Sequence, residues 1–389
     1  MTPDRHAPWL PEIELLIACG RLRLEAGDRA RARAAVAAGL DRDRLLRLST
    51  FHGLLPLLYL HVGRGDVELP TDLATELESL AQARTRRNLQ LTAELGALLD
   101  LCDEQAIPAI PLKGVVLAQQ IYGAITLRRV ADLDLLVREV DLPRVTRLLA
   151  PHGYQADRDT APADDEFDRH TSHHVTVVNA EKRVRVELHR YLLRPRVRGR
   201  WDFDMIAPRL APAPFMGRHV LMFTPEDLLV YLCEHGAEHS WIRLEWLAAV
   251  AELVRSGAVR DWDRVMQWAR ELGTVRRVHA ALLLVSELFG VDVSAAPAVS
   301  DRSLRSANQI VINRLVTDPF RPLEAPAERF GYLYRTDPDQ LTRLRRCWST
   351  AMAPSAADVE LFPLPKVLFP LYGVARPVRL ALRRLRRGL

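Results

Sequence analysis

A short block with strand-like patterning interrupts a chain whose apolar residues otherwise recur at helical intervals. Residues 107–112 (IPAIPL) form an apolar run limited by prolines, as expected of a short strand. Lys113-Gly114 follows, and then a short apolar helical pattern, VVLAQQIY, that ends at Gly123. Residues 132–137 (DLDLLV) alternate acid and leucine before becoming fully apolar, which predicts a second strand.

The elements that follow this block complete a small core. Residues 141–154 have helical spacing, whereas residues 155–172 are polar and acidic and predict a connecting loop. The segments HHVTVVN and RVRVELHR then predict two strands joined at 180–182 as a hairpin. This core is too short for a doubly wound dinucleotide domain, and it has neither a GxGxxG nor a GxxxxGK[ST] loop.

Helical periodicity on both sides of the core sets the expected organisation. We expect an α+β protein in which a small mixed sheet is flanked by N- and C-terminal helical regions. The expected boundaries are an N-terminal helical region over 1–105, the core over 106–195, a C-terminal helical region over 196–345, and a final segment over 346–389 that carries a basic tail.

The net charge of +5 comes from this tail. Residues 374–389 hold six arginines and no acid, so the rest of the chain sums to 5 − 6 = −1. A nearly neutral body gives no firm indication of a broad nucleic-acid-binding face, although the tail can contact an anionic surface.

The composition favours a cytoplasmic protein. No uncharged apolar run is long enough to span a membrane, and the first residues lack the pattern of a secretory signal. The four cysteines are isolated from one another, which fits buried, reduced thiols: Cys19, Cys102, Cys233 and Cys347.

Asp132 and Asp134 give the clearest indication of chemistry. Side chains two apart in a strand project from the same face, and two adjacent carboxylates repel each other unless they are protonated or bridged by a cation. Their hard oxygen atoms suit Mg²⁺ (or Mn²⁺), which takes substrate phosphates as further ligands. A pair of surface acids is the alternative if the motif is taken alone.

A third acid and a phosphate loop extend this site. Glu187 and His189 should share one face of the last strand while their neighbours Val186 and Leu188 enter the core, so Glu187 is the expected third carboxylate and His189 an expected nucleotide contact.

Phosphate contacts are expected from the other end of the block. Gly114 opens a helix directly after a strand, where backbone N–H groups approach an anion. Lys113, Arg128 and Arg129 add positive charge for phosphates.

His235 and His239 form a second, weaker candidate site. They lie four apart on a helical pattern and so share a face, which is compatible with a zinc hydrolase. However, the glutamate that follows the first histidine in zinc protease helices is replaced by Gly236. Packed core histidines, or histidines that line a nucleotide cleft, are the other interpretations.

The block LKGVVLAQQIYGAITLRRVADLDLLV (112–137), with VELH (186–189), resembles the uncharacterised nucleotidyltransferase family of the DNA polymerase β-type superfamily. The similarity extends upstream through 91–111 and downstream to 232–247 and 364–377. One departure is that the wider superfamily has Gly-Ser in its phosphate loop where this chain has Lys113-Gly114, so a seryl contact is missing.

The resemblance implies metal-dependent transfer of an NMP from an NTP, with ATP the expected nucleotide, and release of pyrophosphate. It implies metal ligation by Asp132, Asp134 and Glu187 and phosphate binding by Lys113 and Gly114. The acceptor stays open among small molecules, peptides and proteins. The alternative is a non-catalytic nucleotide-binding or regulatory module that retains the nucleotidyltransferase fold.

Overall fold

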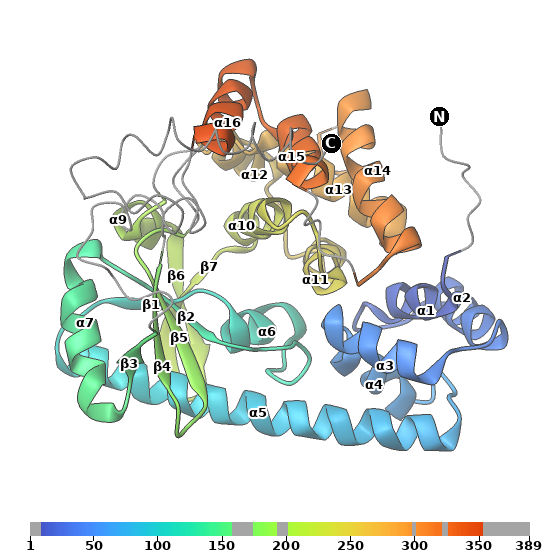
Figure 1. The fold of residues 1–389 in the computed structure, drawn as a ribbon, viewed down its shortest axis with the longest axis horizontal. Helices are drawn as coiled ribbons and strands as arrows, with labels where there is room; N and C mark the ends of the chain where they lie inside the picture. Colours follow the sequence, from blue (N-terminus) through green and yellow to red (C-terminus); the bar gives the residue numbers. More distant parts are fainter. Residues whose placement is uncertain (1–8, 158–173, 193–200, 298–300, 321–325, 353–389) are drawn as a thin grey trace, which may run out of the picture.

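The computed structural model describes residues 9–157, 174–192, 201–297, 301–320 and 326–352 (Figure 1). Most of the predicted acidic loop and the whole basic tail lie outside these ranges. None of the helices in the described residues combines the length and apolar character that crossing a bilayer requires.

A five-stranded mixed sheet lies toward one end of the molecule (Figure 1), with the strands in the order β1-β2-β5-β4-β3. The strands β2 and β5 run parallel, and the other neighbours pair antiparallel. Their bounds are β1 Ala109–Pro111, β2 Leu133–Val137, β3 Gln155–Ala156, β4 His174–Asn179 and β5 Val184–His189. The α+β prediction is confirmed. The loop prediction was wrong at Gln155 and Ala156, which pair with β4 at the sheet edge.

Alternation along the strands gives the sheet two unlike faces. On one face Leu135, Val186 and Leu188 are fully buried, and they belong to an apolar cluster with leucines of α5 (Thr71–Glu104) and α7 (Leu142–Leu149). Because side chains alternate along a strand, Glu187 and His189 occupy the opposite face. The predicted division of residues 186–189 between the two faces is therefore confirmed.

Most of the N-terminal helices lie away from this sheet, at the other end of α5 (Figure 1). The helix α5 runs along one side of the molecule, from the sheet to a group of shorter helices (Figure 1). That group consists of α1 Pro11–Cys19, α2 Ala26–Ala37, α3 Arg42–Phe51 and α4 Leu55–Gly63. The helix α6 (Gly114–Tyr122) lies between the sheet and this group (Figure 1).

A β-hairpin opens the C-terminal part, where the sequence pattern predicted only helices, and that prediction was wrong for these residues. The strands β6 (Leu210–Phe215) and β7 (Arg218–Phe223) form a separate two-stranded sheet. Two prolines in β6 conceal the strand pattern, because proline is usually a sign against a strand. The turn uses Met216 and Gly217 with φ of 50° and 81°, as a tight hairpin turn requires.

The remaining helices pack above the sheet and α6 (Figure 1). They comprise the short α9 Phe203–Ile206 and the longer α10 Pro225–Glu238, α11 Leu244–Arg255, α12 Trp262–Glu271, α13 Val275–Phe289, α14 Arg302–Thr317, α15 Pro326–Thr336 and α16 Gln340–Met352.

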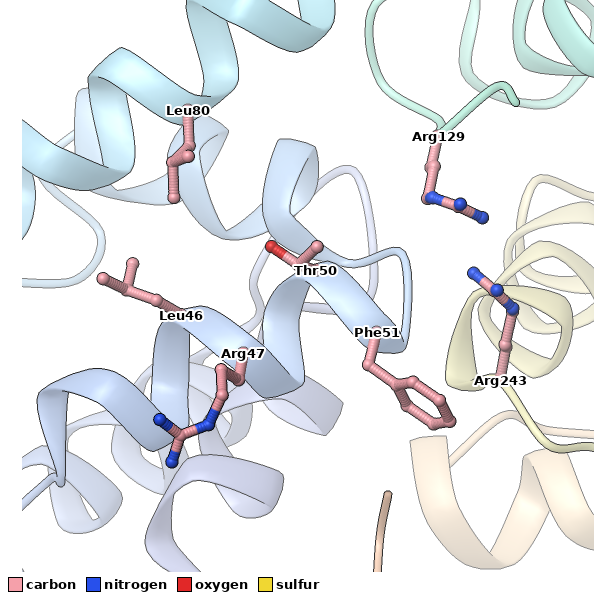
Figure 2. A pocket seen from close by; sticks show the side chains of 7 residues that line it. All are labelled: Leu46, Arg47, Thr50, Phe51, Leu80, Arg129 and Arg243. Carbon is pink, nitrogen blue, oxygen red and sulfur yellow. The ribbon is translucent and has the colours of Figure 1, made fainter. Parts of the chain in front are cut away.

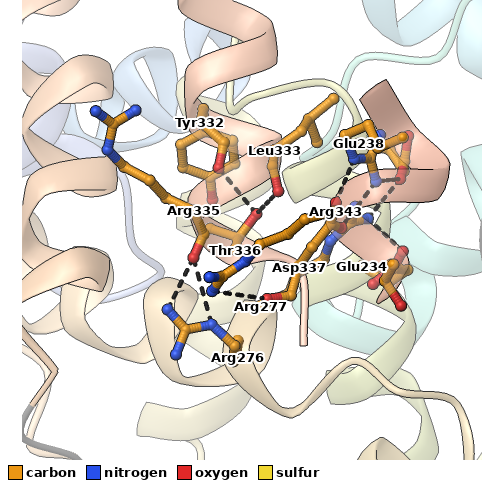
Figure 3. Close-up of polar contacts among 12 residues, drawn as sticks. Glu234, Glu238, Arg276, Arg277, Tyr332, Leu333, Arg335, Thr336, Asp337 and Arg343 are labelled. Atoms are coloured by element: carbon orange, nitrogen blue, oxygen red, sulfur yellow. Dashed lines mark hydrogen bonds and ion pairs between the residues drawn. The ribbon is translucent and has the colours of Figure 1, made fainter. Parts of the chain in front are cut away.

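A buried ion-pair network joins these helices (Figure 3). Arg277 of α13 is fully buried and pairs with Glu234 and Glu238 of α10. Asp337, just after α15, lies 3.3 Å from Arg277 and also pairs with Arg346 of α16. One fully buried guanidinium thus connects α10 with the end of α15.

Candidate active site

The strand register brings two of the predicted acids side by side. In the parallel pair of β2 and β5, Asp134 is the direct partner of Glu187. Asp132 immediately precedes β2 and is half-buried. Since Asp132 and Asp134 are two residues apart, the three carboxylates gather on one face of the sheet.

Asp134 is the most strongly held of the three acids. Its Oδ1 lies 3.3 Å from Nζ of Lys113 and accepts a hydrogen bond of 2.8 Å from Nε2 of His189. Burial by itself would raise the pKa of Asp134, but the Lys113 ammonium and the His189 hydrogen bond outweigh burial and hold that pKa well below its usual range. Asp134 is therefore a fixed anion at the centre of the site.

Glu187 is linked to two histidines. Its carboxylate lies 3.4 Å from Nε2 of His189 and 3.8 Å from Nε2 of His174. Burial opposes ionisation of Glu187, yet the hydrogen bond with His189 lowers its pKa overall. His189, for its part, is fully buried, and its hydrogen bonds to Asp134 and Glu187 raise its pKa despite burial. His189 thus connects two of the acids from below the surface.

Asp132 differs from its neighbours. Burial, followed by repulsion from Asp134 and Glu187, raises the pKa of Asp132 to about 6. Such mutual repulsion among oxygen donors is relieved when a divalent cation binds between them. Oxygen donors of this kind fit Mg²⁺ or a similar hard cation, although the described group whose ligand atoms all lie within 4.8 Å of one another consists of His174, Glu187 and His189 and includes neither Asp132 nor Asp134.

His174 joins the site, although its sequence position did not single it out. His174, Glu187 and His189 each offer a ligand atom, and these atoms lie within 4.8 Å of one another. Burial lowers the pKa of His174 to about 4, which favours its neutral form. The predicted turn at 180–182 would pair residue 174 with residue 188, whereas the turn in the structure is one residue longer and pairs His174 with His189.

The start of α6 lies beside these acids. Lys113 is the last residue before the helix, and Gly114 begins it with a φ of +62°, a conformation that favours glycine. A Cβ atom at Gly114 would come within 3.2 Å of Cγ1 of Val130. The structure therefore places the predicted Lys113-Gly114 turn next to Asp134, through the Lys113 contact.

Arg128 lies within electrostatic reach of the acids. Arg128 is 9% exposed. Its positive charge acts to lower the pKa of Asp132, in opposition to burial, which raises that pKa. The backbone around it is fixed by Asn88 of α5, whose side-chain amide donates to the carbonyl oxygens of Ile125 at 2.6 Å and of Arg128 at 2.8 Å.

Two residues of the helix α10, Tyr231 and His235, face the site. Of these two, the sequence pattern indicated only His235. Tyr231 is buried, and burial raises its pKa to about 12, while the nearby Lys113 charge opposes that rise. His235 is also buried, and burial together with the charge of Lys113 keeps its pKa well below the usual value. Both side chains therefore line the Lys113 side of the site.

His235 and His239 pack against an aromatic ring. Their ring centroids are 4.7 Å apart, and Trp246 lies 5.3 Å from His235 and 5.2 Å from His239. The arrangement supports the interpretation of packed histidines beside the cleft over that of a zinc hydrolase.

The sequence matches the family described as "Uncharacterised nucleotidyltransferase" over residues 38–290. This span includes the whole five-stranded sheet, α6, the β6–β7 hairpin and the helices α10 to α13. No curated protein and no solved structure matches the chain.

Proposed function

The chain belongs to the uncharacterised nucleotidyltransferase family, and on that premise we propose that it transfers an NMP from an NTP, with ATP as the first candidate, to a hydroxyl group of an acceptor. The family supports a general role in nucleotidyl transfer. The metal, the nucleotide and the acceptor are parts of our proposal, and the acceptor class stays open among small molecules, peptides and proteins.

The observation that carries the proposal is the convergence of three carboxylates beside a lysine. Asp134 and Glu187 are direct neighbours across two parallel strands, and Lys113 contacts Asp134 at 3.3 Å. Burial and repulsion from the other two acids perturb the pKa of Asp132. Carboxylates forced together in this way are characteristic of sites that hold divalent cations and phosphates.

In this proposal Asp132 and Asp134 hold Mg²⁺, or Mn²⁺ in its place, and Glu187 completes the set. When bound, the cation neutralises charge on the NTP phosphates and on the pyrophosphate that leaves. Lys113 would add a positive charge on the same side, and the amide of Gly114 at the start of α6 would donate to a phosphate oxygen.

The other residues of the site orient and deprotonate. His189 is buried and donates to Asp134, so we give it a positioning role beneath the carboxylates in addition to the nucleotide contact expected from its sequence position. Glu187 is half-buried and anionic, and it is suited to accept the proton of the acceptor hydroxyl.

In the proposed transfer one phosphorus–oxygen bond forms and one breaks. The acceptor oxygen forms a bond to the α-phosphorus, and the bond from that phosphorus to the bridging oxygen of the β-phosphate breaks with its electron pair. Pyrophosphate leaves with that oxygen, and the acceptor proton passes to Glu187 and then to solvent. No oxidant or further reactant is needed.

The first experiment measures Mg²⁺-dependent ATP binding by titration calorimetry. We expect wild type and the control Asp103→Asn, which removes an exposed acid of α5, to bind alike. We expect Asp132→Asn/Asp134→Asn to lose binding by about tenfold or more, because charge-assisted contacts are lost. Equal binding by wild type and the double variant would reject the metal assignment.

A second experiment separates an enzyme from a non-catalytic nucleotide-binding module. The protein is incubated with Mg²⁺, each of the four NTPs and a panel of acceptors, and pyrophosphate release is followed. Release that requires Asp134 and Glu187 supports transfer. ATP binding without any release across the panel would favour the non-catalytic module.

A further inference from the structure

A basic pocket of about 480 Å³ opens between the N-terminal helices and the region next to the carboxylates (Figure 2). Its walls come from α3, α5, the segment before β2 and the residue before α11. The lining residues are Leu46, Arg47, Thr50, Phe51, Leu80, Arg129 and Arg243.

The arginines of this pocket are brought together without a matching set of acids. Figure 2 shows the guanidinium groups of Arg129 and Arg243 extending toward one another from opposite walls. Nη1 of Arg243 is buried and makes no hydrogen bond in the described residues. It forms a long ion pair with Glu245, whose Oε1 lies 3.9 Å from Nη1. A bound anion would satisfy both guanidinium groups.

A further arginine increases the positive potential. Burial lowers the pKa of Arg84 on α5, and the charges of Arg129 and Arg243 lower it further. Arg243 experiences the same effects, first from burial and then from Arg129. Positive charges held close together raise the local affinity for an anion, most of all for a dianion such as a phosphate monoester.

The pocket is close to the proposed site of transfer. Arg129 is three residues before Asp132, and the Asp132 carboxylate is near enough to Arg243 to influence its pKa. The pocket therefore lies next to the proposed site of transfer.

The rest of the lining indicates a small molecule with an apolar or ring-shaped part. Leu46, Leu80 and Phe51 supply apolar surface, and the Arg243 guanidinium lies 5.8 Å from the centre of the Phe51 ring. A volume of about 480 Å³ falls within the range of small-molecule sites and is too small for a folded partner.

We propose that this pocket, next to the proposed site of transfer, binds the phosphate group of a small phosphorylated acceptor between Arg129 and Arg243. The proposal rests on the proposed nucleotidyl transfer for the role of the bound molecule, but anion binding by the pocket does not depend on transfer.

The test is calorimetric binding of phenyl phosphate and of inorganic phosphate, without metal and with EDTA present. We expect wild type to bind phenyl phosphate more tightly, because the ring contacts Phe51. Arg129→Gln/Arg243→Gln should weaken both ligands about tenfold or more. The control Arg42→Gln, on the same helix as Arg47 but paired with Glu76, should bind like wild type. Unchanged binding in the double variant would overturn the proposal.

Mg²⁺-ATP binding by the same variants separates this proposal from the proposed function. We expect Arg129→Gln/Arg243→Gln to bind Mg²⁺-ATP within about threefold of wild type. A loss as large as that in Asp132→Asn/Asp134→Asn would assign the pocket to the triphosphate and overturn the acceptor role. Phenyl phosphate binding by a wild type that binds no Mg²⁺-ATP would leave the pocket standing and reject the proposed function.

Two further measurements cover folding and polymer ends. Circular dichroism checks that the double variant is folded, and Arg243→Lys, which keeps the charge, should retain more binding than Arg243→Gln. A 5′-phosphorylated oligonucleotide that binds when phenyl phosphate does not would overturn the assignment to a small acceptor.

Discussion

His189 donates a hydrogen bond of 2.8 Å from Nε2 to Oδ1 of Asp134, the same oxygen that Lys113 contacts at 3.3 Å. The imidazole has no exposed surface, and Asp134 is 6% exposed. A nearly buried carboxylate is stable as an anion only when such donors replace the water that it has lost. The pairing therefore fixes the central acid before any substrate binds.

His189→Ala should lower the free energy of unfolding by about 2–3 kcal/mol, because a buried anion loses a hydrogen-bond donor. The matched control is His174→Ala, which removes a partly exposed ring whose contact with Glu187 is 3.8 Å, and it should cost less than about 1 kcal/mol. Urea denaturation measures both. Equal losses would show that the hydrogen bond to Asp134 adds no special stability.

The parts of the site that sequence could predict are those set by local alternation. The two-residue spacing of Asp132 and Asp134, and of Glu187 and His189, decides which face of a strand each side chain occupies. Which strand lies beside which is decided by the sheet, so the direct pairing of Asp134 with Glu187 needed the structure.

Contacts between residues far apart in the chain could not be predicted from the sequence. His174 meets His189 only through the hairpin register, and Arg129 meets Arg243 only because the start of α11 packs near the segment before β2. The hairpin at 210–223 was missed for a local reason, since its prolines conceal the strand pattern. The helices of the N-terminal region, by contrast, could be predicted, because burial of one helix face gives the apolar residues a helical periodicity.

Two glycines inside long helices should respond oppositely to alanine. A Cβ atom at Gly236 of α10 would lie 2.1 Å from Cζ3 of the fully buried Trp241, whereas a Cβ atom at Gly96 of α5 would meet nothing within 4 Å. Gly236→Ala should therefore cost about 3 kcal/mol through overpacking. Gly96→Ala should be neutral or stabilise by up to about 1 kcal/mol, because alanine is the better helix former. Thermal and urea unfolding of both variants check the difference in sign.

The buried network around Arg277 should be essential for stability. Arg277→Ala removes one cation that Glu234, Glu238 and Asp337 share, while Arg346 still pairs with Asp337, and removing one partner of a buried ion pair costs about 3–5 kcal/mol. The control Arg42→Ala removes an arginine that is 49% exposed and pairs with Glu76, so it should cost less than about 1 kcal/mol. Similar urea midpoints for the two variants would contradict this assignment.

His52 should make the stability of the protein depend on pH. It is fully buried at the end of α3, its backbone oxygen accepts from the Glu245 amide at 3.0 Å, and its Nδ1 accepts from the Leu244 amide at 3.3 Å. Burial, with the charges of Arg314 and Arg243, lowers the pKa of His52 from 6.5 to about 3. As the pH falls below 6.5, His52 takes up a proton in the unfolded chain, whereas in the folded protein it stays neutral down to about pH 3. The free energy of unfolding that is present above pH 6.5 is therefore lost between pH 6.5 and about pH 3. Between pH 6 and pH 5, wild type should lose on the order of 1 kcal/mol more than His52→Asn, in which no imidazole titrates. The exposed His152→Asn serves as the control and should keep the wild-type slope, and parallel slopes for wild type and His52→Asn in urea denaturation would exclude this role for His52.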